Sequence, residues 1–236
     1  MRLNDPDAYI TATEAEIIER LLPLKGARVL ELGCGKAWMT RMLVERFGAA
    51  EVVATEVDRV QHEKNLRISD LPNVTFVYGG AEAIDAEDGR FDIVVMFKSL
   101  HHVPVELMDR ALGEIRRVLR PAGLAYFSEP VYWGPFNDIL RLFHDEKGVR
   151  EAAFEALWRS VESGAMELVE EVFFQVPGHY PDWADFESRF IHVTHTEHRL
   201  DKALYQRVRQ AFERHMTPDG VHLMKPHRVD LLRRPA

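Results

Sequence analysis

Short apolar runs alternate, through the first half of the chain, with stretches that carry an apolar residue every three or four positions. Such an alternation of strands and helices is typical of a parallel sheet covered by helices. Helical spacing predicts helices at Tyr9–Leu22, where Thr13 and Glu16 fit a capping box, and at about 37–47. The apolar runs predict strands at 29–32, Glu51–Glu56, Asn73–Tyr78, Phe91–Phe97 and Leu124–Pro130.

The second half of the chain has a less regular pattern. Its apolar positions predict one or two helices within Phe136–Glu162, a strand at Met166–Val176, a helix at about Asp201–Met216 and a last strand at Val221–Leu232. The chain as a whole therefore indicates an α/β fold with extra helices in its second half.

Two glycines, Gly33 and Gly35, follow the first strand and precede a helix. Strand, tight glycine turn and helix N-terminus together are typical of a nucleotide site in a parallel sheet. Glycine at these positions lets the backbone turn sharply and come close to a ligand. A dinucleotide fingerprint would place a third glycine at position 38, which is Trp38, so the loop disfavours a bound pyrophosphate.

The second strand ends in Glu56, about twenty residues after the glycine loop. A carboxylate at this place can accept hydrogen bonds from both hydroxyls of a ribose. Asp58 is the second candidate for that role, although we expect it to cap the following helix.

Composition excludes several classes of protein. At 236 residues with 46% hydrophobic residues, the chain predicts a single domain with an ample core. The net charge of −8 argues against a general nucleic-acid or membrane-surface binder. Residues 1–7 are polar, no apolar run reaches the ~18 residues that span a bilayer, and Cys34 is the only cysteine. We expect a cytoplasmic protein without an intrachain disulfide, either a monomer or a homodimer.

Four motifs between Ala27 and Glu129 resemble the class I S-adenosylmethionine-dependent methyltransferases. They are the acid-x-Gly-x-Gly loop after the first strand, the strand ending in Glu56, Leu-His-His-Val-Pro at 100–104, and Arg-Val-Leu-Arg-Pro-Ala-Gly-Leu at 117–124. The resemblance implies a Rossmann-like, doubly wound, mostly parallel seven-stranded sheet with an antiparallel last strand and a helical insertion. It also divides the domain into an N-terminal helix or lid at 1–24, a cofactor-binding core at 27–130, a helical substrate cover with strand six at 131–220, and a final strand at 221–236.

The resemblance further implies S-adenosylmethionine as cofactor, with S-adenosylhomocysteine as product. The positions that it places at the cofactor are Glu31, Gly33, Cys34, Gly35, Glu56, Val57, Gly80, Ala81, Glu82 and Phe97. One of them departs from the family pattern, because Gly80 stands where an Asp usually contacts the adenine amino group. Either Glu82 takes over that contact, or backbone groups of Gly80 and Ala81 recognise the base alone.

Lys98, His101 and His102 follow the fourth strand, where the resemblance places the methyl group. His102 is the first candidate to face a small organic acceptor, and histidine is suited to act as a general base on a hydroxyl or thiol. Two alternatives stay open: a non-catalytic or regulatory protein that binds the cofactor or its product, and an enzyme that uses a modified cofactor of the same type.

The run of histidines at His192, His195 and His198 invites a metal interpretation. On a helix the third histidine would be rotated away from the other two, and on a strand the middle one would point to the opposite face. Only a loop could bring all three together, so the sequence predicts no metal site.

Overall fold

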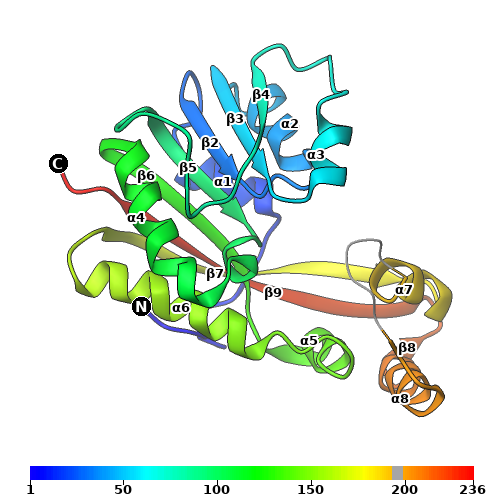
Figure 1. The fold of residues 1–236 in the computed structure, drawn as a ribbon. Coiled ribbons are helices and arrows are strands. Elements are labelled where there is room, and N and C mark those ends of the chain that lie inside the picture. The colour runs from blue at the N-terminus through cyan, green and yellow to red at the C-terminus, as the bar shows by residue number, and fades with distance from the viewer. Residues whose placement is uncertain (193–198) are drawn as a thin grey trace.

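A computed structural model describes residues 1–192 and 199–236 of the chain (Figure 1). Its strands form one nine-stranded sheet with the order β1-β7-β9-β6-β5-β2-β3-β4, and β8 pairs with β9. The strands are β1 (Ile10–Thr11), β2 (Arg28–Leu32), β3 (Glu51–Glu56), β4 (Val74–Tyr78), β5 (Phe91–Phe97), β6 (Leu119–Pro130), β7 (Glu167–Tyr180), β8 (Met216–Thr217) and β9 (Gly220–Arg233). The helices are α1 (Glu14–Leu21), α2 (Trp38–Glu45), α3 (Arg59–Asn65), α4 (Met108–Val118), α5 (Gly134–Leu140), α6 (Lys147–Glu162), α7 (Trp183–Phe190) and α8 (Lys202–Glu213), with 3-10 turns η1 (Leu100–His102) and η2 (Val105–Leu107).

Strands β2 to β6 are parallel, whereas β9 runs antiparallel between β6 and β7. The α/β fold, the mostly parallel sheet and the antiparallel last strand are therefore confirmed. The two strands beyond the expected seven, β1 and β8, are each two residues long.

Helices cover both faces of the sheet. On one face Leu30 and Val94 pack with residues of α4 and α6, and on the other Val29 and Val95 pack with residues of α1 and α2. Neighbouring residues of one strand thus enter different cores, as the near-continuous apolar runs of β2 and β5 predict for strands buried on both sides. Of the helices within the described ranges, none is long and apolar enough to cross a membrane.

The predicted helix at Tyr9–Leu22 was wrong at its start. Residues Ile10–Thr11 instead pair in parallel with Phe174 and Gln175 of β7. The helix begins only at Glu14, because Thr13 and Glu16 form the expected capping box: Glu16 N–H donates to Thr13 Oγ1 (3.3 Å) and Thr13 N–H to Glu16 Oε2 (2.7 Å). Residues before such a box are outside the helix, so their backbone groups can pair with an edge strand of the sheet, which here is β7.

The hairpin of β7 and β9 reaches well beyond the other strands and carries α5, α7 and α8 (Figure 1). The sequence predicted a strand only to Val176, but β7 continues to Tyr180, which pairs with Val221. Tyr180, Phe186 and Phe212 lie at the centre of a third apolar cluster, formed by these helices and the hairpin. We call this part, residues 131–143 with 176–191 and 200–226, the cover lobe.

Candidate active site

The glycine loop takes the conformation that its sequence indicated. Gly33 and Gly35 have φ angles of 77° and 51°, in the left-handed region that favours glycine. A Cβ at Gly33 would also lie 2.8 Å from the Ser99 Cβ, too close for any side chain. The N–H groups of Gly33 and Cys34 donate to the Thr55 carbonyl at 3.1 and 2.9 Å, which ties the end of β2 to the end of β3.

Glu56 lies at the centre of this end of the sheet and is only 8% exposed. Its Oε2 accepts the Gly35 N–H at 2.8 Å, and its Oε1 accepts the N–H groups of Val57 (2.8 Å) and Asp58 (2.9 Å). Asp58 caps α3 by accepting from Val60 and Gln61, as the sequence predicted. The two acids therefore have different tasks, and only Glu56 fixes the glycine loop.

Glu31 and Cys34 are buried around the loop. The Thr40 hydroxyl donates to Glu31 Oε2 at 2.5 Å, so this acid ties β2 to α2. Burial raises the pKa of Glu31 to about 8, which keeps the carboxyl protonated at neutral pH. Burial likewise raises the pKa of Cys34 well above its usual range, and the Asn65 amide lies 3.4 Å from its sulfur. Cys34 is therefore an unreactive thiol that fills the space beneath the loop.

The structure at the end of β4 shows which carboxylate lies near Gly80, where the family usually has an Asp. A side chain at Gly80 would collide with the carboxylate of Glu82, which folds back over that position. A carboxylate thus lies close to the place where the family usually has its Asp, two residues later in the sequence. A small pocket of about 40 Å³ adjoins it, lined in part by Thr55 and Tyr78. Val57, by contrast, is 61% exposed beside the loop.

Lys98, directly after β5 and its last residue Phe97, has a left-handed backbone with φ 56°. This conformation is unusual for a residue with a side chain, and such strain gathers at functional sites. The Lys98 N–H donates to the Ser128 carbonyl at 2.7 Å, which fixes the turn. On the same side of the sheet, Glu14 of α1 accepts from the Tyr126 and Ser128 hydroxyls at 2.6 and 2.9 Å.

The charge of Lys98 acts on two half-buried or buried groups of β9, Lys225 and His227. Burial lowers the pKa of His227 to about 3 and also lowers that of Lys225, and the charge of Lys98 acts in the same direction on both. His227 is thus a neutral ring, stacked on Phe174 with centroids 5.1 Å apart. The sequence did not single out Lys225 or His227, because they reach this end only through the antiparallel course of β9.

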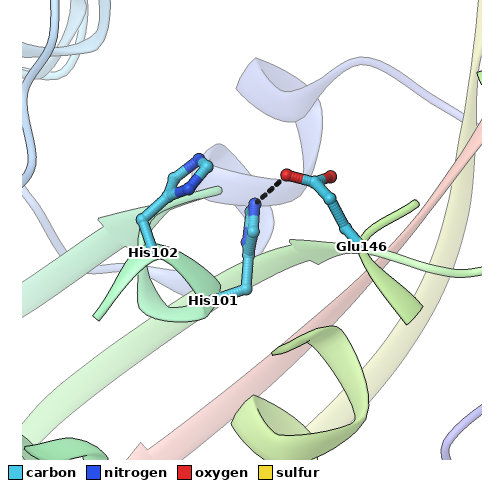
Figure 2. Close-up of side chains that lie close together, drawn as sticks. All are labelled: His101, His102 and Glu146. Carbon is cyan, nitrogen blue, oxygen red and sulfur yellow. Dashed lines mark ion pairs between the residues drawn. The ribbon is translucent and has the colours of Figure 1, made fainter. Parts of the chain in front are cut away.

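The two predicted histidines lie side by side on η1 but differ in exposure (Figure 2). His101 is buried, and its Nδ1 contacts the carboxylate of Glu129, whose other oxygen accepts the Leu100 N–H at 2.9 Å. His102 is exposed, with its ring centroid 4.1 Å from that of His101. Burial lowers the pKa of His102, and the neighbouring His101 ring adds to the effect. His102 is thus the accessible one of the pair.

Sequence reasoning missed Glu129, although a signal was available. It ends β6, the neighbour of β5, and the carboxyl ends of adjacent parallel strands meet at one edge. Of the histidines at 192, 195 and 198, the last two lie outside the described residues. His192 is exposed, and its Nε2 lies 3.3 Å from Glu187 Oε1.

A cavity of about 280 Å³ opens beside the end of β6. Its lining includes Leu3, Glu129, Tyr132, Arg150 and Arg228. Arg228 is buried, with its Nε 2.8 Å from Asp230 and its Nη1 donating to the Leu3 carbonyl at 3.2 Å. The N-terminal residues, α6 and β9 thus meet only in the folded chain, so no local pattern indicated this cavity.

Residues 29–123 match the family model of a methyltransferase domain. This match, together with the relatives described next, supports a class I S-adenosylmethionine-dependent methyltransferase domain. This family implies S-adenosylmethionine as the cofactor. The matched stretch includes the glycine loop, Glu56 and both histidines of η1, but it ends before Glu129 and the cover lobe.

Relatives of this methyltransferase support the assignment. The chain is 33% identical over 119 residues to phthiotriol/phenolphthiotriol dimycocerosates methyltransferase 1 of Mycobacterium ulcerans, covering 50% of this chain and 41% of that protein. It is 38% identical over 108 residues to an uncharacterized methyltransferase of Mycobacterium bovis, covering 46% and 42%. The chain thus spans about two fifths of the length of these relatives.

A solved structure shares the fold along nearly the whole chain. A putative methyltransferase from Bacillus halodurans superposes with a TM-score of 0.68 and 16% identity, covering 95% of this chain and 100% of that one. The cover lobe outside the family match therefore still belongs to the same architecture.

Proposed function

We propose that the chain transfers a methyl group from S-adenosylmethionine to a small organic acceptor and releases S-adenosylhomocysteine. The observation that carries this proposal is Glu56, whose carboxylate joins the glycine loop to the end of β3 at three backbone N–H groups. That arrangement pre-forms the cofactor end of the sheet in a family that uses this cofactor.

The cofactor would lie along the carboxyl ends of β2, β3 and β4. Glu31, Gly33, Cys34 and Gly35 would support its methionine part, the last three through the loop backbone. Glu56 would contact the ribose. The surroundings of the adenine and the methyl group would be formed by Val57, Gly80, Ala81, Glu82 and Phe97. An ionised carboxylate has about four acceptor sites, and three backbone N–H groups already use those of Glu56, so about one site is left for a ribose hydroxyl.

The acceptor would approach from the ends of β5 and β6. Methyl transfer is an in-line displacement, which needs the acceptor atom about 3–3.5 Å from the methyl carbon. His102 is the accessible histidine there and, as a neutral ring, could take the proton of a hydroxyl or thiol. Lys98 is the cationic residue nearest to His102 in the sequence. His101 would position η1 through Glu129 instead of facing the acceptor.

Isothermal titration of the full chain with S-adenosylmethionine, S-adenosylhomocysteine and NAD tests the cofactor assignment. We expect saturable binding of the first two and none of NAD. If neither adenosyl compound binds, the proposed function is wrong, and an enzyme with a modified cofactor becomes the better interpretation.

His102→Ala tests the acceptor end. Loss of a general base should lower methyl transfer by about 10²–10⁴-fold if the acceptor must lose a proton. Cofactor affinity, measured by the same titration, should change little. Transfer is followed with methyl-labelled cofactor and pooled small alcohols, thiols, amines and lipid alcohols. The lipid alcohols belong in the pool because a relative is named for dimycocerosates. An unchanged rate would remove His102 from the acceptor site.

A non-catalytic protein that binds the cofactor or its product is the second candidate, and Gly80 in place of the usual Asp favours it. Binding of both adenosyl compounds without transfer to any acceptor pool, in the wild type as in His102→Ala, would support that function.

A further inference from the structure

His101, His102 and Glu146 come together at the carboxyl end of β5 (Figure 2). The two histidines belong to η1, and Glu146 directly precedes α6. One ligand atom from each residue lies within 4.8 Å of the other two. Imidazole nitrogen and carboxylate oxygen are common ligands of divalent transition metals.

A buried carboxylate holds the Nδ1 side of the His101 ring. Its side chain is 3% exposed and that of Glu129 is 6% exposed, and the two are in contact through Nδ1 and Oε2. Glu129 also accepts the Leu100 N–H, so its carboxylate cannot turn away. A carboxylate acceptor places the ring proton on Nδ1 and leaves the lone pair of a neutral ring on Nε2. Metal-bound histidines have this kind of partner.

The Nε2 of His101 faces Glu146 Oε1 at 3.8 Å. A direct hydrogen bond would bring the two atoms to about 2.7–3.2 Å. Two ligand atoms that each lie about 2.0–2.2 Å from one metal ion are about 3–4 Å apart. The observed separation fits two ligands of one metal ion better than a direct hydrogen bond.

The two oxygens of Glu146 have separate partners. Oε2 lies 2.6 Å from Nη2 of Arg150, whereas Oε1 faces His101 and also lies 2.9 Å from His144 Nε2. The guanidinium therefore holds the carboxylate in place without occupying the oxygen that faces His101. His102, on the exposed side, completes a set of three ligands.

We propose that His101 Nε2, His102 and Glu146 Oε1 form a binding site for a divalent transition metal of the zinc type. Glu129 and Arg150 orient two of the ligands from behind. Three protein ligands leave a coordination position open on the side of His102, as in sites where the metal also binds water or a substrate. Titration with S-adenosylmethionine does not test this site, which can be right or wrong whatever that titration shows. A bound ion would replace the general-base role of His102, because a ring nitrogen that binds a metal cannot also accept a proton.

The test uses the full chain, treated with EDTA, desalted and titrated with Zn²⁺ by calorimetry and with Co²⁺ by visible absorption. We expect a single ion per chain and a cobalt band of four- or five-coordinate intensity. Glu146→Gln and His102→Ala should each weaken binding by at least about tenfold. Thermal unfolding without metal shows whether these variants are folded.

Two controls separate this site from other ligands. Glu151→Gln removes a carboxylate from α6, the helix that Glu146 directly precedes. Glu151 Oε1 lies 3.8 Å from Lys147 Nζ, and this variant should bind zinc like the wild type. The triple variant His192→Ala, His195→Ala, His198→Ala should also bind like the wild type. The proposal is overturned if no saturable binding occurs, if Glu146→Gln and His102→Ala bind as the wild type does, or if the triple variant loses the ion.

Discussion

The two ends of the proposed reaction site are built by different means. The cofactor end consists of backbone groups: two glycines in left-handed conformations, and N–H groups that converge on Glu56 and Thr55. The acceptor end consists of side chains, such as His101, Glu129 and Lys225, from segments far apart in the chain. The first end is determined by local sequence and the second by the assembled fold. The family match covers the glycine loop, Glu56 and both histidines of η1, but it stops before Glu129 and Lys225.

Gly33→Ala should have the largest effect, because the cofactor end depends on backbone shape. The left-handed φ costs a side chain about 1–2 kcal/mol, and the contact with Ser99 adds about 1–3 kcal/mol of overpacking. Gly26→Ala is the matched control, with φ 76° and no atom within 4 Å of the added Cβ. Calorimetry should show lost cofactor binding in the first variant only. Equal binding by both would mean that the close approach to Ser99 is unimportant.

Glu56→Ala should weaken S-adenosylmethionine by about 1–3 kcal/mol, the scale for leaving hydrogen-bonding groups without a charged partner. Glu51→Ala, at the other end of β3 and paired with Arg90 at 2.5 Å, is the control and should leave affinity unchanged. Titration with a cofactor analogue that lacks the ribose hydroxyls separates two roles. If Glu56 binds the ribose, its removal should matter less for the analogue; an equal loss would restrict Glu56 to holding the loop.

His227→Phe tests the effect of a buried, titratable ring at the acceptor end. The pKa of His227 is about 3 in the folded chain, below the ~6.5 of an exposed histidine. The unfolded chain therefore binds the proton first, and folding stability is lost as pH falls from about 6.5 toward 3. Phenylalanine keeps the stack on Phe174 but cannot titrate. Relative to its stability at pH 7, the wild type should lose ~2 kcal/mol more than the variant at pH 5, measured by denaturant unfolding. Parallel pH profiles would contradict this.

Asp58→Ala should have the smallest effect. Loss of the cap on α3 should lower the free energy of unfolding by about 1 kcal/mol. Because Asp58 contacts the loop only through its own N–H to Glu56, cofactor affinity should be preserved. A large loss of affinity would return the ribose role to Asp58.

Much of the cofactor end could be predicted from the sequence because each signal there is local. The bounds of β3 and β5 agree with the predicted strands, since each is a compact apolar run. The Asp58 cap lies next to the helix that it caps. Gly80 shows the limit of such patterns. The sequence shows that the usual Asp is absent at this position, but only the fold shows that the Glu82 carboxylate lies over it.

The sequence predicted Lys98, His101 and His102 at the acceptor end. It could not predict the partners of these residues or the full extent of the cover lobe, because both depend on distant segments. Glu129, His101 and Glu146 come from three separate elements, and nothing in their spacing brings them together. The outer part of β7 was missed for a different reason. Pro177 and Gly178 are strand breakers in sequence, but this outer edge of β7 pairs with β1 only at Phe174 and Gln175, and an edge tolerates proline.

The place of β9 between β6 and β7 has a consequence for synthesis on the ribosome. β9 is the last of the described strands to be made, and β7 pairs with it along almost its whole length. Until residues 220–233 emerge, β7 can pair only with the two residues of β1, and the aromatic side chains of the cover lobe lack the strand against which they pack. The parallel strands β2 to β6 have all their mutual partners by then. The nascent chain can therefore complete its cofactor end first, while the cover lobe is the stretch most in need of protection from aggregation.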